Sequence, residues 1–184
     1  IISSMETNGS KVIDMMMGSH DKQVVFFKNM THHLMNLDRS FLNNTVNVIL
    51  TRNPVEMLPS YAKVINNPSM DDVGYALQVD LLNYLNERDL NPLVIDSTKV
   101  LLNPEKELMY LCKRINIPFN DKMLLWKPQP IKEDGVWAKH WYKNIHKSEG
   151  FNKYKPKTEP FPMDLNALLE SCIPCYDELM RFSN

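Results

Sequence analysis

The residues VILTRNPVEMLPSY, Val48–Tyr61, place a strand pattern directly before the start of a helix. The aliphatic and β-branched run over 46–50 is typical of a short buried strand. Asn53 is a good N-cap, Pro54 suits the first helical position, and Glu56 stands where a capping box has its acid. This stretch therefore predicts a strand that passes straight into a capped helix.

The rest of the chain repeats this alternation. Two further apolar runs, 24–27 and 93–95, have the length and composition of buried strands. Helical spacing of apolar residues predicts four helices, over 57–65, 77–85, 108–115 and 165–180. Strands that alternate with helices, and that are apolar on both faces, predict an α/β fold with a parallel sheet and flanking helices.

Composition limits the classes of protein to consider. A chain of 184 residues is sized for one domain, residues 1–184, with hydrophobic residues at 43% and charged residues at 23%. The 21 basic and 22 acidic residues give a net charge of −1, which does not favour a nucleic-acid-binding domain. No apolar run reaches the roughly 20 residues that span a bilayer, so no membrane partner is expected. An odd, low count of three cysteines does not indicate a disulfide framework.

Glycine is scarce, and this excludes several phosphate sites. The five glycines form no G-x-G-x-x-G, no Walker A loop and no G-x-S-x-G elbow. Arg52, by contrast, follows a predicted strand at the edge of the sheet where ligands bind, and Ser60 lies on the helix that begins there. A guanidinium and a hydroxyl at this spacing can hold a phosphate from two sides. The alternative is structural, with Arg52 pairing a carboxylate and Ser60 merely helical.

A basic and aromatic segment precedes the last helix. Residues 127–157 contain eight lysines and three acidic residues, together with Trp137, Trp141, Tyr142 and Tyr154. A long connection with little periodicity is typical of a lid or a linker, and its aromatics favour order. We expect residues 127–162 to form a lid-like segment and 163–182 a C-terminal helix.

Several motifs of the sequence resemble those of a known family. Arg52-x-Pro54, with Ser60 followed by an aromatic residue, resembles the 3'-phosphate-binding motif of sulfotransferases that use 3'-phosphoadenosine 5'-phosphosulfate (PAPS). Residues 27–33, FKNMTHH, resemble the strand end that carries a lysine and a nearby catalytic histidine in that superfamily.

A second block resembles a particular subgroup. Residues 133–142, EDGVWAKHWY, resemble sulfotransferase-like proteins that stand alone in bacteria and are fused to a branched-chain aminotransferase-like domain in plants. The similarity covers nearly the whole chain, except that the family's first strand and phosphosulfate-binding loop have no counterpart here.

The resemblance implies a three-layer α/β/α fold of the P-loop type and a PAPS-dependent transferase. It implies PAPS as co-substrate, no metal, a small-molecule acceptor, a cytoplasmic location, and fusion or association with an aminotransferase-like domain. We expect this chain to hold the 3'-phosphate half of the nucleotide site and, by itself, to be inactive.

The resemblance also assigns catalytic residues. A base removes the acceptor's proton, and cations stabilise the charge on the sulfonate and the bridging oxygen. His32 or His33 is the candidate base, and Lys28 is a candidate cation. The two histidines stand two residues later than in the familiar Lys-Thr-His pattern. The alternative is that they cap the strand or begin a helix.

Three residues of the basic segment are further candidates for cofactor binding. Trp137 and His140 are expected to cover the adenine or the acceptor, and Lys139 to reach anionic oxygens. The alternative is a lid whose aromatics pack on the sheet and whose lysines are solvated.

Two other features have structural interpretations. Asp96 ends a predicted strand and could act as an acid or base, but a structural hydrogen bond is the stronger hypothesis. Cys172 and Cys175 form a CxxC inside an amphipathic pattern, which favours core packing over redox chemistry or zinc. The function hypotheses are a sulfotransferase, a non-catalytic nucleotide-binding or interaction module, and a nucleotide kinase-like protein.

Overall fold

The computed structural model describes residues 5–131, 134–136, 138 and 142–183. The chain divides into two compact units. One comprises Glu6–Asp96 with Lys157–Asn184, and the other comprises Ser97–Pro156 with Ile1–Met5. The prediction of a single domain over 1–184 stays a prediction.

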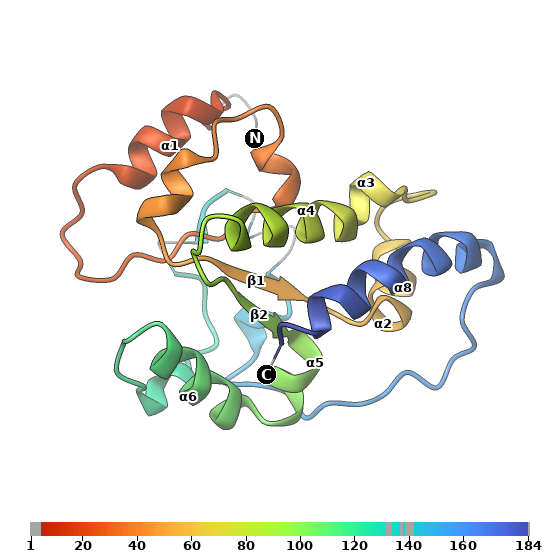
Figure 1. Cartoon of the computed structure of the whole chain (residues 1–184). Helices are drawn as coiled ribbons and strands as arrows, with labels where there is room; N and C mark the ends of the chain where they lie inside the picture. Colours follow the sequence, from red (N-terminus) through yellow and green to blue (C-terminus); the bar gives the residue numbers. More distant parts are fainter. Residues whose placement is uncertain (1–4, 132–133, 137, 139–141, 184) are drawn as a thin grey trace. The chain divides into compact units, whose positions relative to one another are not determined.

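The first unit contains a parallel sheet. Strand β1 (Val48–Thr51) pairs with β2 (Leu93–Asp96), in a register that sets Val48 opposite Leu93 and Thr51 opposite Asp96. Helices α2 (Pro54–Tyr61), α3 (Met70–Val73) and α4 (Tyr75–Asn86) form the connection between the two strands (Figure 1). Two of the three predicted strands are therefore confirmed, and the parallel α/β class is confirmed with them.

Helices α4 and α8 (Asn166–Met180) pack against each other, and each also contacts the sheet, α4 through β1 and α8 through β2. A short 3-10 turn, Met163–Leu165, precedes α8. The largest fully buried side chains come from α2, α4 and α8. They are Leu58, Leu82, Leu85, Leu179, Pro54 and Cys172.

Strand β1 is not buried equally on both faces, whereas all four residues of β2 are buried. On β1, Ile49 and Thr51 are buried, whereas Val48 is 39% and Leu50 60% exposed. The alternation shows that the helices of this unit cover one face of β1. The three-layer α/β/α arrangement therefore stays a prediction.

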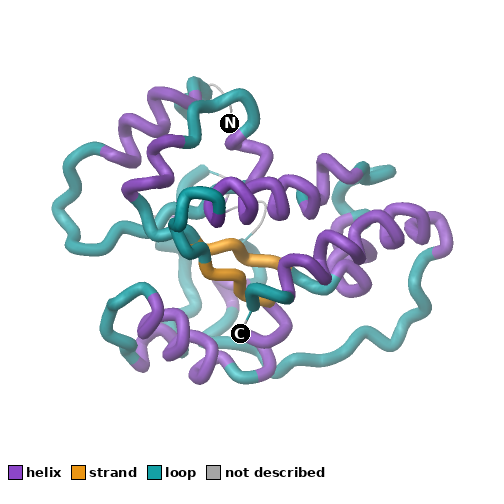
Figure 2. Tube along the Cα trace, in the orientation of Figure 1, coloured by secondary structure: helices purple, strands orange, loops and turns teal. Residues whose placement is uncertain are grey.

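The prediction of a strand over 24–27 is wrong. This stretch lies in the loop between α1 (Gly9–Met17) and the 3-10 turn Thr31–Leu34 (Figure 2). Its side chains are exposed, Val24 at 58% and Phe26 at 84%. β-branched and aromatic residues favour a strand only where a neighbouring edge completes the hydrogen bonds, and no described strand pairs with these residues.

Helix α2 is shorter than its apolar pattern predicts. The pattern extends to Ile65, but the helix ends at Tyr61, and Val64 and Ile65 donate turn hydrogen bonds to the Tyr61 carbonyl at 2.9 Å. Pro59 lies inside the helix and cannot donate a backbone hydrogen bond, which weakens its last turn. The predicted helices over 77–85, 108–115 and 165–180 are confirmed as α4, α6 and α8.

The second unit is built on α5 (Ser97–Leu102) and α6 (Pro104–Arg114), which pack together. The side chain of Asn103 caps α6 by accepting from the Lys106 amide at 3.2 Å. Beyond α6 the described elements are the 3-10 turns Asp121–Met123 and Ile145–Lys147 and an antiparallel bridge between Leu125 and Gly150.

Candidate functional site

The junction between β1 and α2 is firmly anchored. The Asn53 side chain accepts from the Val55 amide at 2.9 Å, and Pro54 occupies the first turn, as predicted. Leu58 has no exposed surface, so α2 is fixed on the core. The hydroxyl of Tyr75 donates to the Arg52 carbonyl at 2.7 Å. The backbone that presents Arg52 is therefore held from both sides.

The Arg52 side chain is only partly satisfied. Its Nη2 donates to Oε2 of Glu56 at 3.3 Å, and the side chain is 38% exposed. Its Nε is buried and makes no hydrogen bond within the described residues, and the same holds for the buried hydroxyl of Thr51. Buried polar groups are normally paired, so unused hydrogen-bonding capacity remains at the end of β1.

Ser60 lies beside a cation that we did not predict. Nζ of Lys157 donates to Oγ of Ser60 at 2.7 Å and to the Glu56 carbonyl at 2.8 Å. The Ser60 hydroxyl is also 3.5 Å from that carbonyl. Lys157 belongs to the same unit as Arg52 and Ser60, although it is 97 residues from Ser60 in sequence. The Ser60 hydroxyl on α2 and the Lys157 ammonium, which comes from the segment before α8, therefore lie together, and Arg52 is near enough to Lys157 to act on its charge.

The electrostatics of this group favour an anion. Desolvation lowers the pKa of Lys157, and repulsion from Arg52 and Lys63 lowers it further, while Glu56 and Glu159 oppose the shift. A lowered lysine pKa means that the charged ammonium is disfavoured where it stands. A bound anion would relieve that repulsion. We call Arg52, Ser60 and Lys157 the β1-end cluster.

The predicted catalytic residues lie on another segment. Lys28 is exposed and stands in the loop before the 3-10 turn that contains His32 and His33. That turn packs on α4, and the Asp72 carboxylate lies close enough to His32 to interact electrostatically. Arg52 pairs with Glu56, and Lys157 contacts both Glu56 and Ser60. The described contacts of the histidines are instead with α3 and α4.

The ring of His33 is partly committed. Its Nδ1 accepts from the Met30 amide at 3.4 Å, and its ring lies edge-on to that of His32, with centroids 4.6 Å apart. Burial lowers the pKa of His33, and the nearby His32 lowers it further. This pKa keeps His33 neutral near pH 7, the form that can accept a proton. The contact between His33 and the Met30 amide is the one expected if the histidines only cap the strand or begin a helix.

The close approach of this turn to α3 and α4 depends on Gly74. Gly74 has a φ of +74° and ends α3 where α4 begins. A Cβ at this position would meet Oγ1 of Thr31 at 3.0 Å. Glycine is therefore needed at this position both for the left-handed backbone and for the close contact with Thr31.

Asp96 has a structural partner. It is 2% exposed, and its Oδ2 accepts from the Tyr176 hydroxyl at 3.0 Å. Burial raises the pKa of Tyr176, and the charge of Asp96 raises it further, so the phenol remains the donor. This hydrogen bond fits the structural interpretation of Asp96.

The cysteines of the CxxC belong to the core. Cys172 is fully buried, and its Sγ lies 3.6 Å from the sulfur of Met70. Burial, with a smaller contribution from Cys175, raises the pKa of Cys172 to about 11, which is opposite to a reactive thiolate. Among the described residues, no group of three potential metal ligands of the His, Cys, Asp or Glu type comes together.

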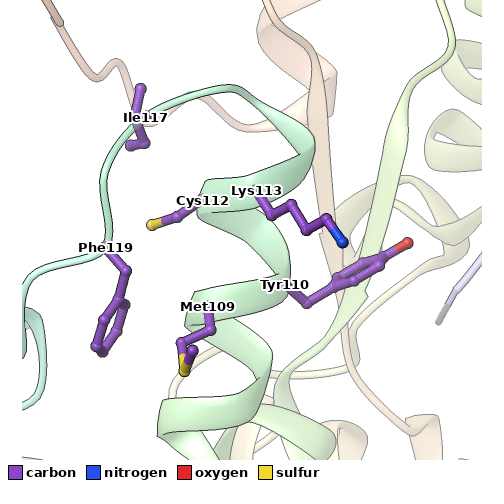
Figure 3. A pocket seen from close by; sticks show the side chains of 6 residues that line it. All are labelled: Met109, Tyr110, Cys112, Lys113, Ile117 and Phe119. Atoms are coloured by element: carbon purple, nitrogen blue, oxygen red, sulfur yellow. The ribbon is translucent and has the colours of Figure 1, made fainter.

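The candidates Trp137, Lys139 and His140 lie outside the described residues. Elsewhere in their unit, α6 borders a cavity of about 300 Å³. Figure 3 shows Cys112 and Phe119 facing one side of α6, whereas Tyr110 and Lys113 extend on the other. None of the predicted site residues that the structure describes lines this mostly apolar cavity, which also includes Met109 and Ile117.

Comparison with known proteins identifies the class. A family model described as "Sulfotransferase domain" matches residues 1–182. The chain therefore belongs to this sulfotransferase domain family.

Two curated relatives come from Arabidopsis thaliana. Over 181 residues, the chain is 38% identical to branched-chain-amino-acid aminotransferase-like protein 1 and 35% identical to branched-chain-amino-acid aminotransferase-like protein 2. Each match covers 97% of this chain but 32% of the relative, so the chain spans about a third of their length. These relatives agree with the subgroup that residues 133–142 resemble. No solved structure matches the chain significantly.

None of the described helices is both long and apolar enough to cross a membrane.

Sequence reasoning missed Lys157. The signal was present in the pair Lys155-Pro-Lys157 at the end of the basic segment, but so many lysines stand there that sequence alone does not single out one. Only the return of the chain to α2 distinguishes Lys157 from its neighbours.

Proposed function

We propose that this chain is the nucleotide-binding part of a PAPS-dependent sulfotransferase, in which the β1-end cluster holds the 3'-phosphate. Arg52 and Ser60 are the residues that the family motif suggests, and Lys157 joins them. The observation that carries the proposal is the position of Nζ of Lys157, 2.7 Å from Oγ of Ser60, in surroundings that lower its pKa. A doubly charged phosphate suits a site where two cations repel each other.

The phosphate would compete with contacts that now occupy the cluster. The Arg52–Glu56 pair, at 3.3 Å and partly exposed, is a weak one. Arg52 can therefore turn toward a phosphate at little cost, and its buried Nε supplies a further donor. The buried hydroxyl of the preceding residue, Thr51, also has no partner among the described residues.

In the proposed reaction a hydroxyl oxygen or an amine nitrogen of the acceptor attacks the sulfur of PAPS in line. The new O–S or N–S bond forms as the bond between sulfur and the 5'-phosphate oxygen breaks, which releases 3'-phosphoadenosine 5'-phosphate (PAP). The acceptor's proton passes to a base, for which His32 and His33 are the candidates, and Lys28 would stabilise the developing negative charge. The acceptor is a small molecule, and the reaction uses no metal.

The remaining proposals rest on the family resemblance and the relatives. Trp137 and His140 would cover the adenine or the acceptor, and Lys139 would reach its anionic oxygens. The names of the two relatives support association with an aminotransferase-like domain. We propose a cytoplasmic location.

A comparison of two nucleotides tests the phosphate assignment. PAP and adenosine 5'-monophosphate differ by the 3'-phosphate alone. We expect calorimetric titration to show at least about tenfold tighter binding of PAP, since a charge-assisted pair contributes roughly 1.5–3 kcal/mol. Ser60→Ala and Lys157→Met should reduce this preference, whereas Lys11→Met, an exposed lysine of the same unit, should not. Equal binding of both nucleotides would overturn the assignment.

A second function has an observation in its favour. The contact between Nδ1 of His33 and the Met30 amide, and the displaced spacing of the histidines, favour a non-catalytic nucleotide-binding or interaction module. That module would bind PAP without turnover. Transfer of radiolabelled sulfate from PAPS to any acceptor by the protein that contains this chain, lost on His32→Ala or His33→Ala, would exclude it.

A further inference from the structure

A second cavity, of about 420 Å³, lies wholly within the unit Ser97–Pro156. Its apolar lining comes from Trp126, Ile131 and Ile145. This volume falls in the range of small-molecule sites, which are typically concave, mostly apolar and equipped with few polar groups. Neither the β1-end cluster nor the histidines of residues 32–33 belong to it.

The aromatic wall is held in place. The indole N–H of Trp126 donates to Oγ of Ser148 at 3.1 Å, and the ring meets Phe151 edge-on at a centroid distance of 5.4 Å. The Trp126 amide donates to the Glu149 carbonyl at 3.1 Å, next to the bridge between Leu125 and Gly150. A wall fixed by backbone and side-chain bonds loses little entropy when a ligand binds.

One polar pair in the lining is already satisfied. Nε2 of His146 lies 2.8 Å from Oδ2 of Asp134, and the same oxygen accepts from the Ile131 amide at 2.9 Å. Both side chains of the pair are less than 20% exposed. The Ile131 amide, and then His146, lower the pKa of Asp134, so this carboxylate is ionised and engaged. It holds the cavity wall together rather than offering its charge to a ligand.

Among the described lining residues, the remaining charged group is Lys127, which is accompanied by the side-chain amide of Gln129. No carboxylate among the described residues forms an ion pair with Lys127. An ammonium and an amide beside an aromatic wall suit a ligand that carries one negative group on an apolar ring. A cationic ligand would face Lys127, and a purely apolar one would make no use of the Lys127 and Gln129 donors, which are both exposed.

We infer that this cavity binds a small aromatic carboxylate, with the ring against Trp126 and the isoleucines and the carboxylate on Lys127 and Gln129. The inference does not depend on nucleotide binding by the other unit.

The probe is trans-cinnamate, and its matched neutral control is cinnamyl alcohol. NMR titration of the labelled chain should show saturable shifts of the Trp126 indole N–H and of the amides near residues 127–131 and 145–146. The dissociation constant should be on the order of 1 mM, as expected for a ligand of this size. Cinnamyl alcohol should bind about tenfold more weakly, because it lacks the charge.

Two lysine variants locate the charge. Lys127→Met should weaken cinnamate binding about tenfold and leave the binding of cinnamyl alcohol unchanged. Lys122→Met, another exposed lysine of the same unit, should change neither. Gln129→Leu should weaken cinnamate less than Lys127→Met does, since a neutral hydrogen bond is weaker than a charged one.

Three results would overturn the inference. They are the absence of saturable shifts at Trp126, equal affinity for the acid and the alcohol, and equal loss in Lys122→Met and Lys127→Met. The PAP titration is independent of all three, so failure of the nucleotide proposal and failure of this one are distinguishable.

Discussion

The ends of the two parallel strands differ in how their polar groups are used. Thr51 and Asp96 lie opposite each other in the register, and both are buried. At the end of β2, Asp96 accepts a hydrogen bond from Tyr176. At the end of β1, Thr51 and the adjoining Arg52 keep polar atoms without partners in the described part of the chain.

This difference separates a structural polar group from a candidate binding group. Asp96 is tied to α8 and contributes to the packing of its unit. Arg52 is tied down at its backbone by Tyr75, but its side chain has one weak, partly exposed ion pair. A position with a fixed backbone and an uncommitted side chain is suited to ligand binding. We therefore expect substitutions at the end of β2 to lower stability, and substitutions at the end of β1 to lower ligand affinity.

The largest expected effect comes from removing the packing beneath the β1 end. Leu58→Ala should lower the free energy of unfolding by about 2–5 kcal/mol, because Leu58 is fully buried on α2. Denaturant unfolding measures this. Val55→Ala, on the same helix but 45% exposed, should cost far less, no more than about 1 kcal/mol. Equal losses would mean that α2 is not anchored as described.

The contrast itself is tested by comparing Asp96→Ala with Arg52→Ala. We expect Asp96→Ala to lower the free energy of unfolding by about 1–3 kcal/mol, since it leaves the half-buried Tyr176 hydroxyl unpaired. Arg52→Ala should cost less than about 1 kcal/mol, as its ion pair is partly exposed. Thermal or denaturant unfolding of both variants decides the order. A larger loss for Arg52→Ala would assign Arg52 a structural role.

The smallest effect concerns pH. The lowered pKa of Lys157 means that the folded state releases this proton at lower pH than the unfolded state does. Stability should therefore rise slightly as pH increases through the folded pKa toward the ordinary lysine value. PAP binding should weaken over the same alkaline range, because the ammonium is lost. In Lys157→Met both trends should be reduced, and an unchanged pH profile of affinity in this variant would argue against Lys157 as a ligand.

Local sequence signals predicted the strand-to-helix junction well. The N-cap at Asn53, the proline at the first helical position and the short apolar strand each act within a few residues, and all three appear in the structure. Helix α6, of which the apolar pattern predicted only 108–115, begins with the same local chemistry at Asn103-Pro104.

Features that depend on distant parts of the chain were not predictable in this way. The run over 24–27 has strand composition, but composition cannot supply a pairing edge. Lys157 reaches Ser60 from 97 residues away, and no local pattern marks that contact. A structural hydrogen bond was the stronger hypothesis for Asp96 from sequence. Its partner, Tyr176, could not be named without the position of α8.

The most direct test of the central claim is thermal unfolding of the chain with and without PAP, in the wild type and in Arg52→Ala. At about 100 times its dissociation constant, PAP should stabilise the wild type by roughly 2.7 kcal/mol, a shift of several degrees in the melting temperature. Arg52→Ala should melt close to the unliganded wild type and show little or no shift, while Arg88→Ala, on a partly exposed arginine of the same unit, keeps the full shift. A full shift in Arg52→Ala, or none in the wild type at saturating PAP, would contradict a 3'-phosphate site at the end of β1.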